Sequence, residues 1–346
     1  MSLHDEILEQ PAVASRFLET QAAAIDALAT ALRDRRDQIE HVVIAARGSS
    51  DHAAIYAQYV LGIRHGLTAG LATPSMVSLY GADPSQAHTL VVAISQSGAS
   101  PDIVAVVDAA RRQGAPTVAI TNDTASALAA AAEWTIDMSA GPERSIAATK
   151  TYTASLLAIA ALSAALGDDA DRRALGSMPG AIGSMLELEG AMASIAEAHA
   201  RADRALVVAR GYEYATAREW AIKIKELAHV FADPYSAADF QHGPVALVEP
   251  GVPVIVVVRD GPAAAGLVEL LGRLRDDFDA DVTVLSDVPE ALAQASRAVP
   301  LPPVAAEWLA PIATVVAGQL HALHLTRARG LDPDAPRSIS KVTRTR

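Results

Sequence analysis

A serine-rich turn, SQSGASP at 95–101, is the strongest candidate for a ligand site. It follows the apolar run TLVVAI and precedes the helical pattern PDIVAVVDAARRQG, so in a parallel sheet it lies at the carboxyl end of a strand, where ligands bind. With Ser100 as N-cap and Pro101 at N1, free backbone N–H groups would lie beside serine hydroxyls and favour a phosphate dianion. The structural alternative is an ordinary serine-rich strand-to-helix turn, because capping by itself explains Ser100 and Pro101. The candidate phosphate ligands are Ser95, Gln96, Ser97 and Ser100.

A second polar turn follows the first apolar run, HVVIAA at 41–46. It contains Gly48, Ser49 and Ser50. Because the carboxyl ends of neighbouring parallel strands meet at one edge of a sheet, its hydroxyls could converge with the first turn on one crevice.

Three charged residues in the second half, Glu219, Lys223 and Glu226, have spacings of four and three. On a helix they project from one face. A solvated salt-bridge stripe is the ordinary interpretation of such a face. The functional interpretation has a carboxylate that moves a proton next to a carbonyl while the lysine stabilises the negative charge that develops.

Two further residues could take part in chemistry but do not stand out alone. His242 lies in a loop, DFQHGP, just ahead of an expected buried strand, and Lys341 lies in the irregular C-terminal segment. Loop histidines are more often structural or exposed, although loops also carry catalysis. The histidines fall at no metal-ligand spacing, so we predict no metal and no cofactor.

The elements that must position these residues alternate regularly along the chain. Short β-branched runs are each followed by a polar or glycine turn and an Ala/Leu-rich helix, which predicts α/β domains with an open parallel sheet and helices on both faces, the doubly wound, flavodoxin-like arrangement. This order occurs twice: Gly48 and Gly211 lie 163 residues apart, as do Gly98 and Gly261. The chain therefore contains an internal duplication.

The duplication supplies an internal control for the polar turns. The second half has Arg259-Asp260-Gly261-Pro262 in place of SQSGAS, and Gly211-Tyr212-Glu213 in place of Gly48-Ser49-Ser50. The fold thus does not need the hydroxyls, which indicates that they bind a ligand in the first half.

We expect five segments. They are an N-terminal helical segment (1–30), a first, phosphate-binding domain (31–175), a helical linker (176–200), a second domain (201–330) and a C-terminal active-site tail (331–346). The last helix is expected to end at Gly330.

Composition excludes several classes of protein. The 28 basic and 40 acidic groups give a net charge of −12, which argues against a nucleic-acid partner. There is no cysteine, the first residues lack the pattern of a signal peptide, and the longest apolar run is far shorter than the roughly 20 residues that span a bilayer. We predict a cytoplasmic protein without a membrane partner.

Seven ordered motifs along nearly the whole chain resemble the isomerase half of glucosamine-6-phosphate synthase (glutamine–fructose-6-phosphate aminotransferase) and its stand-alone sugar-isomerase (SIS) domain relatives, which include glucosamine-6-phosphate deaminases. The motifs are EILEQP, ARGSSDHA, SQSG, AATKTYT, EWAIKIKELAH, FQHGPVALV and PRSISKVT. The resemblance implies two tandem SIS domains.

The resemblance also implies roles for the candidate residues. The two serine turns would hold the phosphate and nearby sugar hydroxyls, and Glu226, with Lys223 beside it, would move a proton between C1 and C2. Glu219 and Ala148 would line the sugar site. His242 would assist ring opening from the neighbouring subunit of a homodimer that shares its active sites, and Lys341 would close over the sugar and help to open the ring, in one version through an imine.

Departures from the synthase pattern favour a stand-alone deaminase. The chain has no cysteine to release ammonia from glutamine, Ala148 stands where the synthase pattern has a serine, and Arg47 replaces a small residue. The expected reaction is glucosamine 6-phosphate plus water giving fructose 6-phosphate and ammonia. The alternatives are a deglycase acting on a fructosamine-type 6-phosphate and a non-catalytic sugar-phosphate sensor.

Overall fold

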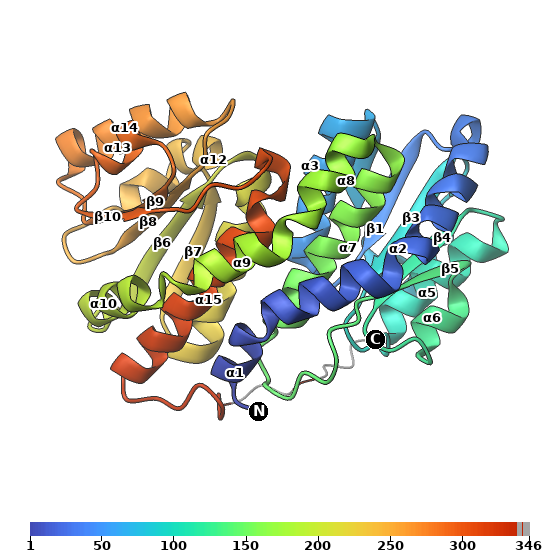
Figure 1. The fold of residues 1–346 in the computed structure, drawn as a ribbon, viewed down its shortest axis with the longest axis horizontal. Helices are drawn as coiled ribbons and strands as arrows, with labels where there is room; N and C mark the ends of the chain where they lie inside the picture. Colours follow the sequence, from blue (N-terminus) through green and yellow to red (C-terminus); the bar gives the residue numbers. More distant parts are fainter. Residues whose placement is uncertain (338–340, 342–346) are drawn as a thin grey trace. The chain divides into compact units, whose positions relative to one another are not determined.

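The computed structural model describes residues 1–337 and Lys341, and the chain forms two compact units. The first, here called the β1–β5 unit, contains residues 9–143 and 150–177 together with Lys341. The second, the β6–β10 unit, contains residues 1–8, 144–149 and the chain from Met178 to Arg337. Each unit is described by itself (Figure 1).

The β1–β5 unit has a five-stranded parallel sheet in the order β2-β1-β3-β4-β5. Its strands are β1 (His41–Ala45), β2 (Thr68–Leu71), β3 (Thr89–Ile94), β4 (Thr117–Thr121) and β5 (Trp134–Asp137). The chain leaves β1 for the edge strand β2 and then returns to β3 on the other side of β1. The carboxyl ends of β1 and β3 therefore border the point where the strand order reverses, which is where open α/β sheets bind ligands.

Both faces of this sheet are covered because its central strands are apolar on both sides. On β3, Val91 and Ala93 pack toward α5, whereas Leu90 and Val92 face the opposite way, toward α3 and α7. One face carries α2 (Gln10–Asp34), α3 (Ser49–His65) and α7 (Lys150–Leu166), with α8 (Asp169–Gly176) against α7. The other carries α4 (Pro74–Ser78), α5 (Pro101–Arg112) and α6 (Ala127–Ala131). A short 3-10 turn, η1 (Arg36–Gln38), precedes β1.

The β6–β10 unit repeats this topology. Its parallel sheet has the order β10-β9-β8-β6-β7, formed by β6 (Arg204–Ala209), β7 (Phe231–Ser236), β8 (Val254–Val258), β9 (Val282–Ser286) and β10 (Arg297–Pro300). Read from the second strand of each unit, both orders are 2-1-3-4-5. The predicted duplication and the doubly wound fold are confirmed.

The helices of the β6–β10 unit also lie in two layers. On one side are α10 (Glu189–His199), α11 (Tyr214–Lys223) and α15 (Ala310–Ala328), with α9 (Met178–Leu186) and α1 (Leu3–Leu8) against α15. On the other are α12 (Ala237–Gln241), α13 (Ala264–Phe278) and α14 (Pro289–Leu292). The short turns are η2 (Gly211–Glu213), η3 (Ile224–Ala228), η4 (Pro244–Leu247) and η5 (Glu307–Leu309).

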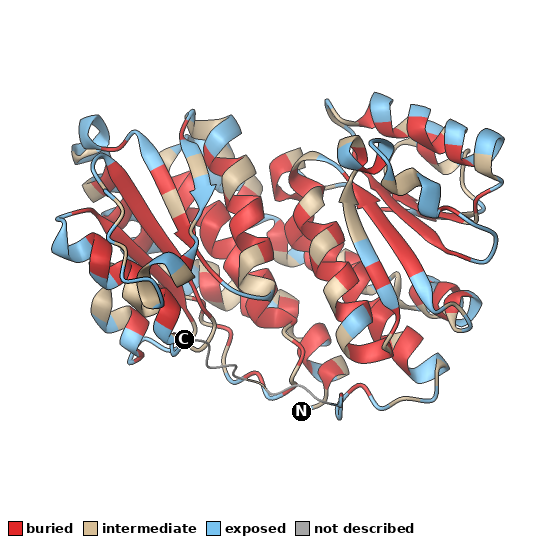
Figure 2. Cartoon of the chain, turned by 180° about the vertical axis from the view of Figure 1, so that it is seen from behind, coloured by how far each residue is buried: buried red, intermediate tan, exposed pale blue. Residues whose placement is uncertain are grey.

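One apolar helix forms the core of each unit. Figure 2 shows the central strands and these helices as mostly buried, with the exposed residues on the edge strands, the outer helices and the loops. In α7 every residue from Lys150 to Ala165 is buried. The segment Glu307–Ala328, which contains α15, is long and apolar enough to span a membrane by length and composition, but 94% of its apolar window is buried inside the protein. It is a core helix of the β6–β10 unit.

Candidate functional site

The two serine turns lie where the sequence places them, at the carboxyl ends of the adjacent strands β1 and β3. Gly48 is the N-cap of α3, and Ser49 and Ser50 begin that helix, with both serines partly exposed. Ser100 is the N-cap of α5 and Pro101 occupies its first turn, as predicted. The hydroxyl of Ser100, however, makes no capping hydrogen bond. It therefore remains available for another acceptor or donor.

The remaining side chains of the 95–100 turn differ in how far they are buried. Ser95 is 8% exposed, whereas Gln96, Ser97 and Ser100 are partly exposed. The Ser97 hydroxyl accepts a 3.3 Å hydrogen bond from the N–H of Ala99. The structure thus offers two helix N-termini and a set of partly exposed hydroxyl and amide groups on adjacent strands, an arrangement that suits an anion.

An ion pair joins the two turns. Nε and Nη2 of Arg47, at the end of β1, each lie 3.0 Å from Oδ2 of Asp102 in the first turn of α5. The Asp102 side chain is 1% exposed, while that of Arg47 is 46% exposed. Sequence reasoning noticed Arg47 only as a departure and missed Asp102. The pair fixes the spacing of the two helix N-termini and places a cation beside the turns.

Both the backbone conformation and the lack of room for a side chain require a glycine at position 98. Its φ is +58°, and a Cβ at this position would lie 2.1 Å from Oγ of Ser126. The turn can therefore approach the start of α6 this closely only with glycine.

The equivalent place in the β6–β10 unit is filled by the protein itself. Arg259, at the end of β8, is 5% exposed and places Nη1 2.9 Å from Oδ2 of Asp287, while its Nε is 3.7 Å from Oε1 of Glu213. Glu213 follows β6, and Oγ1 of Thr314 in α15 donates to it across 2.8 Å. Burial raises the pKa of Glu213, and Arg259 opposes that rise. Internal charges here occupy the position that the serine turns leave open in the β1–β5 unit.

The three charged residues of the second half meet in the structure. Nζ of Lys223 lies 2.6 Å from Oε2 of Glu226 and 3.4 Å from Oε1 of Glu219. Glu219 and Lys223 are buried in α11, whereas the Glu226 side chain is 25% exposed. The predicted shared face is confirmed. The helix changes its period within it: Glu226 lies on η3, a π-helical turn that follows α11 directly and is capped by His229 in the left-handed conformation. Such turns are frequent at functional sites.

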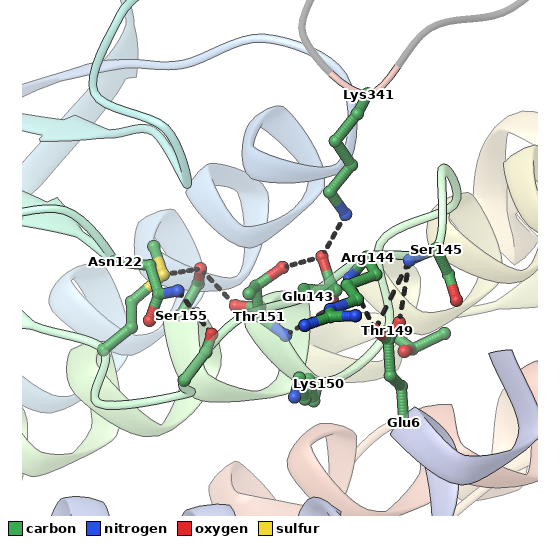
Figure 3. Close-up of polar contacts among 12 residues, drawn as sticks. Glu6, Asn122, Glu143, Arg144, Ser145, Thr149, Lys150, Thr151, Ser155 and Lys341 are labelled. Carbon is green, nitrogen blue, oxygen red and sulfur yellow. Dashed lines mark hydrogen bonds and ion pairs between the residues drawn. The ribbon is translucent and has the colours of Figure 1, made fainter. Parts of the chain in front are cut away.

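The loop between β5 and α7 carries a buried carboxylate, Glu143, which sequence reasoning did not single out. Its Oε1 accepts the N–H of Thr151 (3.1 Å) and its Oε2 accepts the Thr151 hydroxyl (2.7 Å). Figure 3 shows Lys341 reaching the same carboxylate, with Nζ 2.5 Å from Oε2. Lys341 is thus placed on the β5–α7 loop. The other residues of the predicted tail beyond Arg337 lie outside the described residues.

Acidic residues near the start of the chain hold both ends of this loop, which explains the EILEQP motif. The carboxylate of Glu6, fully buried, accepts the N–H groups of Arg144 (2.5 Å) and Ser145 (3.3 Å) (Figure 3). Glu9 lies 2.7 Å from Nζ of the buried Lys150. In the sequence, the only sign of these contacts was that EILEQP is one of the family motifs, and a motif does not show which residues its side chains contact.

Two predicted site residues show no site contact. Ala148 is partly exposed in the β5–α7 loop, beside the buried Thr149. His242 is exposed at the C-cap of α12. It is followed by the 3-10 turn η4, so the expectation of a strand directly after it is wrong: β8 begins only at Val254. Pro244 at the start of that turn has no N–H for a strand ladder.

A comparison with family models matches the SIS domain to residues 37–165 and again to residues 200–325. The chain belongs to the SIS family. It carries two SIS domains, each a five-stranded parallel sheet with helices on both faces.

Curated relatives of this tandem SIS protein include glutamine–fructose-6-phosphate aminotransferases. That of Gloeobacter violaceus is 32% identical over 353 residues, which cover 97% of this chain and 57% of the relative. That of Symbiobacterium thermophilum is 31% identical over 313 residues, 88% of this chain and 51% of the relative. The chain spans about half the length of the curated relatives it matches.

Solved structures of stand-alone SIS proteins are also similar. A protein of Silicibacter pomeroyi, provisionally named a phosphosugar isomerase, is 35% identical with a TM-score of 0.87, covering 96% of this chain and 100% of that one. The glucosamine-6-phosphate deaminase of Thermotoga maritima has a TM-score of 0.78 and 19% identity over the whole of both chains, which shows a shared fold.

Within residues 1–337 and Lys341, no three or more His, Asp or Glu side chains form a group that could hold a metal ion. The serine turns of the β1–β5 unit offer hydroxyls and helix N-termini, which suit an anion, and the β6–β10 unit carries the Glu219–Lys223–Glu226 cluster.

Proposed function

We propose that this SIS protein is a phosphosugar isomerase that deaminates glucosamine 6-phosphate, with water as co-substrate and fructose 6-phosphate and ammonia as products. The observation that carries the proposal is the Glu226–Lys223–Glu219 cluster, in which a partly exposed carboxylate lies 2.6 Å from a buried ammonium. A carboxylate beside a fixed cation is the arrangement that proton transfer next to a carbonyl needs.

The phosphate binds at the two serine turns in this proposal. Gly48, Ser49 and Ser50 present the N-terminus of α3, and the 95–100 turn presents that of α5. The free N–H groups at these two helix N-termini and the neighbouring hydroxyls donate hydrogen bonds to the phosphate oxygens. The free hydroxyl of Ser100 is one of these donors.

Proton transfer is assigned to Glu226. In the open-chain aldehyde it removes the proton from C2, and the electron pair of that bond moves toward C1 and its oxygen. Lys223 stabilises the negative charge that develops there, and Glu219 holds Lys223 in place. Glu226 returns that proton to C1, and O1 takes up a proton as the nitrogen gives one up, so that C1 becomes a hydroxymethyl group and C2 an imine. Addition of water to the imine then releases ammonia and leaves the ketose.

Ring opening is assigned to His242 and Lys341, and Ala148 is assigned to the wall of the sugar site. His242 is exposed in a single chain. Apolar side chains of the same unit are exposed as well: Phe231, which begins the edge strand β7, is 82% exposed, and Leu247, in η4, is 42% exposed. We therefore propose a homodimer in which this edge is covered and His242 serves the site of the other copy.

The location that goes with this proposal is the cytoplasm. A chain without cysteine cannot form disulfides, which fits a reducing compartment.

The test is release of ammonia and fructose 6-phosphate from glucosamine 6-phosphate by the wild type, Glu226→Gln and Lys341→Ala. Lys225→Ala is the matched control, because Lys225 is adjacent to Glu226 and exposed. We expect Glu226→Gln to lose at least about a hundredfold in kcat, the scale of acid–base catalysis, and Lys225→Ala to retain wild-type activity.

Absence of release by the wild type would contradict the proposal. If fructosamine-type 6-phosphates were then cleaved, the protein would be a deglycase. If sugar phosphates raised the melting temperature without any turnover, it would be a sensor.

A further inference from the structure

The chain contains four lysines, and three of them lie in ion pairs with glutamates. Lys150 pairs with Glu9 and Lys223 with Glu226. The third pair, Lys341 with Glu143, joins residues 198 positions apart. Lys225 is exposed at the surface. The lysine of the C-terminal segment thus has a specific partner in the β1–β5 unit.

The carboxylate of Glu143 is held in one orientation, in which it can accept a hydrogen bond from an ammonium group. Its side chain is fully buried, and both oxygens accept hydrogen bonds from Thr151 at the start of α7. Donors at a helix N-terminus stabilise a carboxylate anion and fix its orientation. Oε2 then accepts the ammonium of Lys341, whose side chain is 24% exposed (Figure 3).

We propose that Glu143 is a positioning residue that docks the Lys341 ammonium on the β5–α7 loop, and that this contact sets where the C-terminal amine stands when a sugar phosphate binds. The Glu143–Lys341 contact, here called the dock, requires no assumption about the reaction. The effect of the dock on turnover rests on the proposed function. Ala148, which the proposed function assigns to the wall of the sugar site, follows Glu143 in the same loop.

The dock is tested by lysine reactivity. The protein is treated with limiting N-hydroxysuccinimidyl acetate, and acetylation of Lys341 is measured by peptide mass spectrometry relative to Lys225. A carboxylate-bound ammonium is a poor nucleophile, so Glu143→Gln should raise the Lys341-to-Lys225 rate ratio about fivefold or more, the scale of a partly exposed ion pair. Glu9→Gln, which removes the equivalent pair of Lys150, should leave the ratio unchanged.

A third variant separates loss of charge from local unfolding. Thr151→Val removes one donor to the same carboxylate but keeps its charge, and it should keep the ratio within about twofold of the wild type. An unchanged ratio in Glu143→Gln would overturn the dock. If Glu143→Gln does not fold, Glu143→Asp, which withdraws the carboxylate by one methylene, must raise the ratio instead.

Turnover tests the consequence separately. Glu143→Gln should lower kcat toward the value of Lys341→Ala with little change in KM, and the double variant should be no slower than Lys341→Ala alone, because both changes remove one function. Additive losses would overturn the positioning role. A wild type that does not turn over glucosamine 6-phosphate would refute the proposed function, while the acetylation ratios would still decide the dock.

Discussion

Trp220 donates its indole N–H to Nδ1 of His321 across 3.0 Å inside the β6–β10 unit. Since Nδ1 is an acceptor, Nε2 of His321 carries the proton and donates to Nδ1 of His199 (3.2 Å), whose Nε2 in turn donates to Thr283 (3.3 Å). Both histidines are therefore neutral in the folded protein. This buried chain of bonds ties α11, which carries Glu219, to α15, α10 and β9.

The first prediction is a loss of stability in mild acid. Burial lowers the pKa of His199 to about 4 and that of His321 well below its ordinary value. Below about pH 6.5 the unfolded chain takes up protons that the folded chain does not. The free energy of unfolding should thus fall from about pH 6.5 toward pH 4, by up to about 1.4 kcal/mol per pH unit for each histidine.

Urea denaturation at pH 7.5, 6.0 and 5.0 measures this slope. His199→Gln should show a shallower slope over the same range, because one of the two titrating groups is gone. Equal stability at pH 7.5 and pH 5.0 would show that the histidines are not held neutral.

The second prediction compares two serine N-caps. The Ser126 hydroxyl accepts the N–H of Ala129 (3.3 Å), whereas the Ser100 hydroxyl caps nothing. Ser126→Ala should therefore cost about 1 kcal/mol of stability and Ser100→Ala less than about 0.5. In the proposed function, Ser100→Ala instead raises KM for the sugar phosphate about tenfold, as loss of one hydrogen bond to a charged group would. A Ser100→Ala protein with lowered stability and unchanged KM would make Ser100 a structural residue.

The third prediction compares two glycines with positive φ. Gly66, at the C-cap of α3, has φ +63° and open space around the position of a Cβ, so Gly66→Ala should cost about 1 kcal/mol. Gly98→Ala adds overlap with Ser126, whose Cβ and Oγ would lie within 2.5 Å, and should cost at least about 3 kcal/mol. Thermal unfolding measures both, and Ser126→Gly should restore part of the loss. Equal costs at the two positions would refute the packing argument.

The fourth prediction concerns the internal charges of the β6–β10 unit. Arg259→Met leaves Glu213 buried without its cation and should cost about 3 kcal/mol or more. Adding Glu213→Gln removes the stranded charge and should restore roughly half of that loss. Chemical denaturation of the single and double variants tests the coupling. Additive losses would mean that the two side chains do not compensate each other.

Much of the fold follows from the sequence, because its signals are local. Apolar runs such as TLVVAI bounded by glycine turns predicted buried parallel strands, and the 163-residue repeat predicted two sheets of one topology, both of which the structure confirms. The helical spacing of Glu219 and Lys223 likewise brought their side chains together, since a helix fixes which residues share a face. The π-helical turn under Glu226 was beyond this reasoning, because an α-helical period carries no sign of it.

Only the tertiary structure decided which groups meet across long stretches of chain. Lys341 and Glu143 are 198 residues apart in the sequence, and Glu6 accepts the N–H of Arg144, which is 138 residues away in the sequence. No periodicity encodes such pairs, because each depends on how separate elements pack. The sequence determined the strands, the turns that end them and the residue types available for chemistry. Packing determined that Ser100 keeps its hydroxyl free while Arg259 fills the equivalent place, because a buried charge must find its partner wherever the fold brings one.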